Sequence, residues 1–256
     1  MALTLAEIAE LKRLRDQARR KQSFSPAPVA AVPIPAPMEP TEPSGQPVET
    51  VAQPQARKGL PEGYVPSEAE LLRYLGEWDK LVDYVDQENG LAMIFRGDET
   101  FAANTDLRHV IVKCAVLNDF YATNIFKIAS VARKIVSIPG FDARLAAGDR
   151  NLVEEIAFVD NRRNYSFATK YCSHHKPELF PIYDRYVADV LHEMRRREPG
   201  NFRFRSKDEL KDYMTFCEAI DDFSKAYGLE AYSYKEIDRY LWQLGKEYYN
   251  YYNNNQ

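Results

Sequence analysis

Apolar residues recur every three to four positions along most of the chain from about residue 66 onward, which is typical of amphipathic helices. Ser67 followed by Glu70 forms a capping box that opens a predicted helix running through Leu81. Further helices are predicted after Asp106 through Ile125 and then over residues 128–138, 151–158, 165–174, 185–197, 207–227 and 233–248. Sustained alternation of apolar and polar residues does not occur. We therefore expect a mainly α fold, an orthogonal helical array.

Residues 4–21 form a separate amphipathic pattern that predicts a helix. Thr4 and Glu7 fit a capping box, Leu5, Ile8 and Leu11 lie on one stripe, and arginines and lysines fill the C-terminal half. Two interpretations stay open: a helix that docks on its own domain or on a protein partner, and a basic anchor on nucleic acid.

Residues 23–62 differ from both neighbours because they are dense in Pro, Ala, Glu, Gln and Val. Eleven of the 15 prolines lie between Pro26 and Pro66. Proline removes backbone donors and fixes φ, so we expect an extended, disordered linker. The predicted organisation is an isolated helix at 1–22, a linker at 23–62 and a helical domain at 63–256.

The composition adds few restrictions. A net charge of −4 argues against a uniformly basic surface but leaves room for a basic patch. The three cysteines are far apart and form no CxxC pair, so neither a disulfide framework nor a zinc site is expected. No stretch approaches the ~18 apolar residues of a membrane span, and the N-terminus lacks a secretory apolar region. We expect a cytoplasmic protein that needs neither a membrane nor a metal or other cofactor.

Residues 161–187 contain the densest chemistry. Asp184 follows Pro181 in the first turn of a predicted helix, where the positive helix end favours a carboxylate. Its role is either a helix cap or a catalytic carboxylate, and Lys170 is either a solvated residue or an active-site amine. His174 and His175 are adjacent and point about 100° apart on a helix, which disfavours a shared metal ion and favours hydrogen bonds to Asp184 or to a phosphate.

Two further segments indicate binding. Residues 161–211 contain 12 Lys and Arg against 7 Asp and Glu, interleaved with aromatic residues, a pattern that suits a phosphate backbone or simply a solvated face. Residues 117–126, LNDFYATNIF, mix amides, a carboxylate and apolar residues with no clean polar face. Such a helix should be buried, with its polar groups knitting the core or lining a pocket.

The order of these segments resembles the helix-hairpin-helix (HhH-GPD) DNA glycosylase superfamily, and more closely the bacterial 8-oxoguanine DNA glycosylase-like proteins. The resemblance covers residues 105–200. It rests on LNDFYATNIF at 117–126, on the span 142–149, on Ala168-Thr169, and on Pro181-Ile182-Tyr183-Asp184. The segments at 117–126 and 165–184 are also similar to a bacterial subfamily that includes phage-restricting glycosylases acting on glucosylated hydroxymethylcytosine. The superfamily's Gly-rich hairpin and following lysine are absent, because residues 159–166 read VDNRRNYS.

The resemblance implies a monofunctional DNA glycosylase that excises a modified or damaged base, with DNA as its partner. It assigns catalysis to Asp184. Lys170 lies one turn beyond the position expected for the family's lysine and is a second catalytic candidate, although the resemblance does not support a lyase step. We expect the base pocket to be lined by Asn118, Asp119, Tyr121, Asn124, His174, His175 and Tyr183. We expect the DNA backbone to be held by Arg162, Arg163, Arg185, Arg195, Arg196 and Arg197. The alternatives are a non-catalytic nucleic-acid-binding module and a helical adaptor that assembles through its N-terminal helix.

Overall fold

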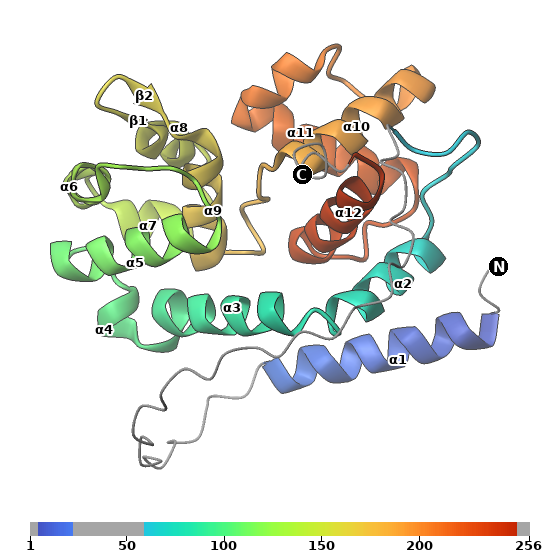
Figure 1. The fold of residues 1–256 in the computed structure, drawn as a ribbon, viewed down its shortest axis with the longest axis horizontal. Helices are drawn as coiled ribbons and strands as arrows, with labels where there is room; N and C mark the ends of the chain where they lie inside the picture. The colour runs from blue at the N-terminus through green and yellow to red at the C-terminus, as the bar shows by residue number, and fades with distance from the viewer. Residues whose placement is uncertain (1–4, 23–58, 250–256) are drawn as a thin grey trace, which may run out of the picture. The chain divides into compact units, whose positions relative to one another are not determined.

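The computed structural model describes residues 5–22 and 59–249, and these residues divide between two units (Figure 1). The first unit contributes α1, Leu5–Gln22, which agrees with the predicted helix to within one residue at either end. Arg13 donates to Glu10 from one turn further along this helix. The linker predicted for residues 23–62 lies outside the described residues as far as residue 58.

The second unit begins at Gly59 in the described residues, four residues earlier than the predicted domain. Gly59 donates its backbone N–H to the carbonyl of Tyr248 over 3.1 Å, and Leu60 is buried. Residues 59–62 therefore pack on the folded unit and do not belong to a linker.

Helices dominate the second unit, which confirms the predicted mainly α fold. Its elements follow in the order α2 Glu68–Trp78, α3 Val82–Ala92, the π-helical turn η1 Met93–Gly97, α4 Glu99–Ala102, α5 Leu107–Phe120, α6 Ile128–Ser137, α7 Phe141–Ala146, α8 Asn151–Ala157, β1 Phe158–Val159, β2 Arg162–Arg163, α9 Tyr165–His175, α10 Arg185–Arg197, the 3₁₀ turns η2 Pro199–Asn201 and η3 Lys207–Lys211, α11 Tyr213–Ala226 and α12 Tyr234–Tyr249.

Local side chains define several of these helix ends. Ser67 accepts from the backbone N–H of Glu70 at 3.3 Å, so the predicted capping position opens α2. Asp106 does the same for α5, accepting from the N–H of Arg108 at 2.8 Å. Gly228, with φ +66°, follows the end of α11 in the left-handed conformation that glycine accepts without strain.

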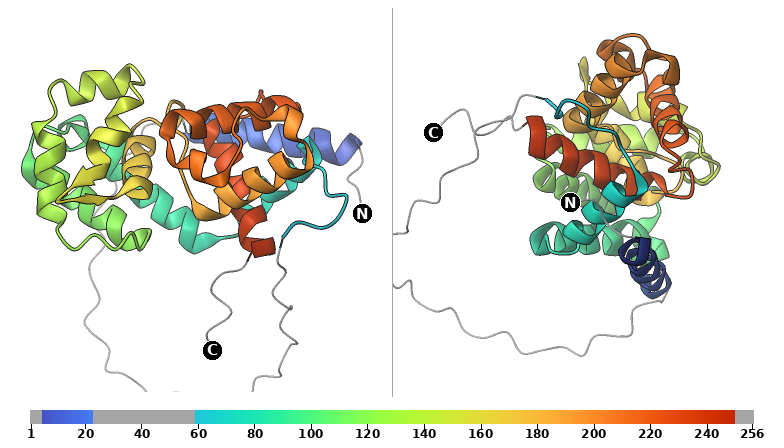
Figure 2. Two further views of the ribbon diagram at one scale, coloured as in Figure 1. Left: turned by 90° about the horizontal axis from the view of Figure 1, so that it is seen from above. Right: turned by 90° about the vertical axis from the view of Figure 1, so that its right-hand side faces the viewer.

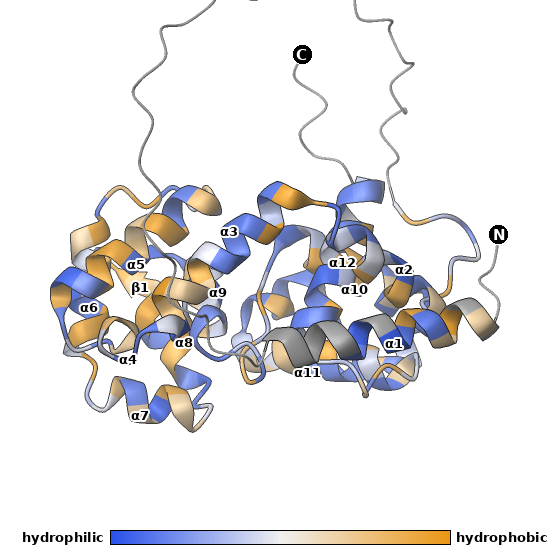
Figure 3. Cartoon of the chain, turned by 90° about the horizontal axis from the view of Figure 1, so that it is seen from below, coloured by the Kyte–Doolittle hydropathy of each residue, from blue (hydrophilic) through white to orange (hydrophobic). Residues whose placement is uncertain are grey.

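Two sets of helices pack separately within the second unit (Figures 1 and 2). In one set α5 packs against α6, and α8 packs against α9. In the other set α12 packs against both α2 and α10. Helix α3 contacts α5 and α9, and the segment between α9 and α10 connects the two sets along the chain. Figure 3 shows hydrophobic and hydrophilic residues alternating along α5, α6 and α12, as amphipathic helices require.

Three predicted helices differ from the structure in length. The first ends at Trp78, and a separate helix, α3, follows from Val82. The helix predicted through Ile125 ends at Phe120, because Ala122 and Asn124 adopt positive φ angles that a helix cannot contain. The pattern at 207–227 divides into η3 and α11, since Asp212 is extended and caps α11.

The described strands form one hairpin, which sequence periodicity did not predict. Phe158 pairs with Arg163 and Val159 with Arg162, and Asp160 and Asn161 form the turn at φ 50° and 61°. Asp and Asn adopt the left-handed region more readily than other side chains do, so this two-residue turn closes without glycine. None of the helices in the described ranges combines the length and hydropathy that a membrane span requires.

Candidate active site

Lys170 is buried on α9, with 3% of its surface exposed. Its ammonium donates to Ser166 Oγ at 2.6 Å and to the carbonyl of Tyr183 at 3.3 Å. Burial lowers the pKa of Lys170, while the carboxylates of Asp184 and Asp238 act in the opposite direction. A lysine in this position is not a solvated helix residue.

Asp184 stands at the N-cap of α10, beside that lysine. Its Oδ1 accepts from the backbone N–H of Tyr186 at 2.8 Å, and its Oδ2 lies 3.9 Å from Lys170 Nζ. The side chain is 25% exposed, so it is half-buried and does not face open solvent. One oxygen thus caps the helix and the other remains directed at a buried amine, so the capping role leaves room for a second role.

Tyr121 and His174 extend this group from two other segments. The Tyr121 hydroxyl lies 2.9 Å from His174 Nε2, and the Lys170 Nζ lies 5.1 Å from the centre of the Tyr121 ring. Burial holds the pKa of His174 well below its ordinary value, so this imidazole is neutral at physiological pH. Arg96 additionally donates to the His174 carbonyl, which fixes the end of α9.

His175 belongs to the core and not to the group around Lys170. Its ring lies 4.8 Å from that of Phe95 and 5.3 Å from that of Tyr171, and burial lowers its pKa well below the ordinary value. Among the described residues its Nε2 has no hydrogen-bond partner, and none of the hydrogen bonds described joins either histidine to Asp184. Nor do any three His, Cys, Asp or Glu side chains in the described ranges gather as metal ligands would.

The segment after α5 is a turn and not the buried helix that we expected. Asn118 Oδ1 accepts from the N–H of Ile125 at 2.8 Å and from Thr123 Oγ1 at 2.7 Å, so this amide closes the turn. Asp119 and Asn124 are exposed. Phe126, at 84% exposure, could not lie in a buried helix. Of the four residues assigned here to the base pocket, Tyr121 alone is shown to lie beside Lys170.

Tyr183 contributes its backbone to the site. Its carbonyl accepts from Lys170 Nζ and from Ser166 Oγ, at 3.3 and 3.2 Å. Its ring packs against Tyr165, with centroids 4.6 Å apart, and against Phe216 at 5.3 Å. The aromatic ring therefore packs against α9 and α11.

Helices α3 and α12 bring further charges that sequence reasoning missed. Glu88 on α3 forms ion pairs with Lys235 and Arg239 on α12. Asp238 lies between these two cations in the sequence of α12, and among the described residues its buried Oδ1 has no hydrogen-bond partner. Burial raises the pKa of Asp238 to about 6, Lys235 and Lys170 act against that shift, and Asp184 and Glu88 add to it.

These electrostatic couplings connect both helices to the Lys170 group. The Asp238 charge acts on Lys170 and on Tyr121, and the Glu88 charge acts on Tyr121. The spacing of Lys235, Asp238 and Arg239 at i, i+3 and i+4 was the available sequence signal, because it places three charges on one helix face. That signal did not reveal which elements the face meets.

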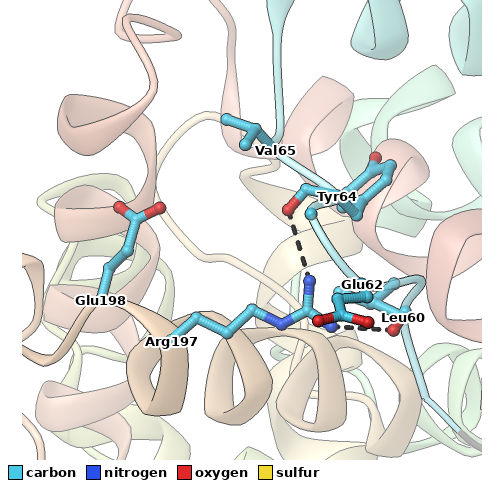
Figure 4. Close-up of a pocket in the computed structure, with 7 residues that line it drawn as sticks. Leu60, Glu62, Tyr64, Val65, Arg197 and Glu198 are labelled. Carbon is cyan, nitrogen blue, oxygen red and sulfur yellow. Dashed lines mark hydrogen bonds between the residues drawn. The ribbon is translucent and has the colours of Figure 1, made fainter.

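The arginines assigned to DNA divide into engaged and exposed groups. Arg195 donates to the Phe204 carbonyl at 3.2 Å. Arg197 donates to the carbonyls of Leu60 at 2.8 Å and Pro61 at 2.9 Å. It also lines a pocket together with Leu60, Glu62, Gly63, Tyr64, Val65 and Glu198 (Figure 4). Both guanidinium groups are thus engaged within the protein, and their predicted role on DNA stays a prediction.

The remaining assigned arginines leave more of their surface available. Arg185 and Arg162 are exposed, and Arg196 is 64% exposed while pairing with Glu193 at 2.9 Å. Arg163, within the hairpin, pairs with Glu154 and donates to the Lys211 carbonyl at 2.6 Å, so its side chain is fixed.

Comparison with known proteins identifies relatives of this chain. The family model HI_0787_N, described as an N-terminal domain, matches residues 70–179. A protein of Haemophilus influenzae (strain ATCC 51907 / DSM 11121 / KW20 / Rd) that carries the name "Uncharacterized protein" is 42% identical over 154 residues, which are 59% of this chain and 70% of that protein. The chain belongs to the family of this Haemophilus protein. No solved structure matches the chain.

The stretch matched by the family model contains part of the candidate site. Tyr121, Lys170 and His174 lie within residues 70–179, whereas Asp184 and Asp238 lie beyond them. The site thus combines residues of the matched N-terminal domain with residues that follow it.

Proposed function

We propose that this protein is a DNA glycosylase that hydrolyses the N-glycosidic bond of a modified or damaged base. The observation that carries the proposal is the Asp184 carboxylate, half-buried at the start of α10 with one oxygen capping the helix and the other 3.9 Å from the buried Lys170 amine. The resemblance of residues 105–200 to the HhH-GPD superfamily places a catalytic carboxylate at this position.

The chemistry requires a negative charge beside the deoxyribose. As the bond between C1′ and the base breaks, positive charge builds on the sugar, and a carboxylate held in a partly dry environment stabilises it. Asp184 Oδ1 is fixed by the helix N-terminus, so the reaction needs little reorganisation of the carboxylate. The same group can orient or deprotonate the water that attacks C1′.

Lys170 influences the charge of Asp184 in this proposal. Its hydrogen bonds to Ser166 and Tyr183 fix the amine 3.9 Å from Oδ2. Burial lowers the pKa of Lys170, the Asp184 charge acts against that shift, and a protonated amine partly compensates the charge of Asp184. We assign Lys170 a positioning role and no covalent step.

The hairpin surface supplies the contact with DNA in this proposal. Phe126 is 84% exposed and Phe158 is 58% exposed, and each has an arginine 5.9 Å from its ring centre, Arg162 and Arg163 respectively. Exposed aromatic rings interleaved with guanidinium groups suit unstacked bases and phosphates. The hairpin leads directly into α9, which bears Lys170.

An excision assay tests the proposal. Duplexes that carry uracil, 8-oxoguanine or glucosylated hydroxymethylcytosine are incubated with the protein, and abasic sites are measured by strand cleavage in alkali. We expect wild type to release at least one of these bases and Asp184→Asn to lose at least 100-fold in rate, since such losses follow removal of a group that stabilises the transition state.

The asparagine variant separates catalysis from capping, because asparagine caps helices as well as aspartate does. Asp212→Asn is the matched control: Asp212 is the exposed N-cap of α11 and accepts from the N–H of Thr215 at 2.9 Å. We expect this control to keep full activity and both variants to keep wild-type affinity for DNA. Binding to DNA without abasic sites on any duplex would support the non-catalytic module. A protein that neither binds DNA nor releases a base would leave the adaptor interpretation.

A further inference from the structure

We propose that Asp238 is the general acid of this site, which donates a proton to the departing base while Asp184 stabilises the sugar. This inference rests on the proposed glycosylase function and extends it to a second carboxylate. Glycoside-cleaving sites commonly divide the work between two carboxyl groups, one protonated and one ionised. The resemblance in the sequence assigns no role to Asp238, which lies beyond residue 200.

Asp238 lies on the face of α12 that packs against α10. Gly245 lies on α12 where a β-carbon would come within 2.7 Å of the carbonyl oxygen of Tyr186, so the two helices approach at backbone distance. Asp238 lies seven residues before Gly245 and shares its helix face. Tyr186 follows Asp184 by two residues, and the Asp184 charge acts on Asp238.

Asp238 differs from its neighbours in lacking a fixed partner. Its Oδ1 is buried and accepts no hydrogen bond from any described residue. The carboxylate of Glu88 on α3 acts on the charge of Asp238, but it is paired with both Lys235 and Arg239. A buried carboxyl oxygen without a donor is better satisfied when the group is protonated, because the proton removes the cost of a bare charge.

Some charged groups around Asp238 raise its pKa and others lower it. Lys235 on the same helix and Lys170 on α9 favour its ionised form, whereas burial, Asp184 and Glu88 favour the protonated form. The Asp238 charge also acts on the Tyr121 hydroxyl. Lys235 acts on the imidazole of His174, which is neutral. Burial is the largest of these influences, and the pKa of Asp238 is raised to about 6. Two carboxyl groups in unlike surroundings are the usual arrangement for separate acid and base roles.

The proposed step balances as a hydrolysis. The Asp238 carboxyl group transfers its proton to a ring nitrogen or oxygen of the base as the C1′–N bond breaks and its electron pair leaves with the base. Water adds to the cationic C1′ and gives a proton to Asp184. Asp184 passes this proton to solvent, Asp238 takes up another from solvent, and both groups return to their starting states.

The pH dependence of excision tests this assignment. Single-turnover rates are measured from pH 5.0 to 8.5 on the base of the panel that wild type releases fastest. We expect the wild-type rate to fall tenfold per pH unit above about 6, as Asp238 loses its proton. Asp238→Asn should be about 100-fold slower at pH 6, independent of pH above 6, and equal to wild type near pH 8.

Two controls separate an acid from a structural residue. Asp86→Asn removes an exposed carboxylate from α3 and should keep the wild-type profile. DNA affinity and thermal unfolding should be the same for Asp238→Asn as for wild type. If Asp238→Asn fails to fold, the pH profile of wild type still tests the assignment. A wild-type rate that does not change between pH 5.5 and 8 overturns it. A wild type that releases no base at any pH overturns the glycosylase function itself, and excision with a parallel pH profile in Asp238→Asn overturns only the acid.

Discussion

Gly245 is the position at which the smallest substitution should cause a clear loss of stability. It is buried on α12, and a β-carbon there would lie 2.7 Å from both the carbonyl oxygen and Cβ of Tyr186, and 2.9 Å from its carbonyl carbon. Carbon atoms pack best at about 3.5–4.0 Å, so the helices must separate by about 1 Å. Two of the three obstructing atoms belong to the backbone of α10, so a rotamer change cannot relieve the contact.

The expected loss follows from two opposing contributions. Overpacking of this kind typically costs ~1–3 kcal/mol, whereas alanine stabilises a helix interior by ~1 kcal/mol relative to glycine. Because the obstacle is backbone, we place the overpacking cost of Gly245→Ala near the top of that range and expect a net loss of ~1–2 kcal/mol. A unit of this size should then unfold at a temperature about 2–8 °C lower.

Gly90→Ala provides a matched control within another helix. Gly90 lies in α3, and no atom lies within 4 Å of the β-carbon that alanine would add. This substitution should therefore raise stability by ~0.5–1 kcal/mol. Thermal and urea unfolding, followed by circular dichroism at 222 nm, measure both variants under the same conditions. If Gly245→Ala is as stable as wild type while Gly90→Ala is stabilised, the close approach of α12 to Tyr186 is wrong.

Three further predictions concern buried and exposed cations. Burial lowers the pKa of Lys113 to about 8, so between pH 8 and 10.5 the unfolded chain binds more protons than the folded chain. The free energy of unfolding of wild type minus that of Lys113→Met should therefore rise over this range. A difference that does not change with pH would contradict this prediction. Borohydride should trap no covalent adduct between Lys170 and abasic DNA, because the Lys170 amine is buried and already donates two hydrogen bonds. An adduct that Lys170→Gln abolishes would give Lys170 a covalent role. Replacing Arg162 and Arg163 by alanine should shallow the slope of log K against log salt by about one to two units, and Arg196→Ala by about one or less; unchanged slopes would remove these arginines from the DNA contact.

The sequence predicted the elements that short-range contacts define. Ser67 and Asp106 cap helices through hydrogen bonds to residues two or three positions away, so their neighbours are enough to identify them. Asp184 followed the same rule, because Pro181 ends one segment and the helix pattern restarts just beyond it. Its position at a helix start was therefore predictable, and so was the presence of Lys170 on the preceding helix.

Short-range reasoning was wrong where a few backbone angles decided the outcome. The apolar pattern of residues 117–126 continued a helix, but Ala122 and Asn124 take positive φ angles and Asn118 closes a turn. The turn at Asp160 and Asn161 was missed in the same way, since a strand pair of two residues each leaves too short a pattern to detect.

The tertiary structure alone decided which distant side chains meet. The ion pairs of Glu88 with Lys235 and Arg239, and the hold of Arg197 on residues 60 and 61, join positions more than 130 residues apart. Asp238 is one of many helix charges in the sequence, and only the packing of α12 brings it under the influence of the Asp184 and Lys170 charges. Helix periodicity and caps depend on neighbours within about four residues, whereas the surroundings of a buried charge depend on every helix that packs against it.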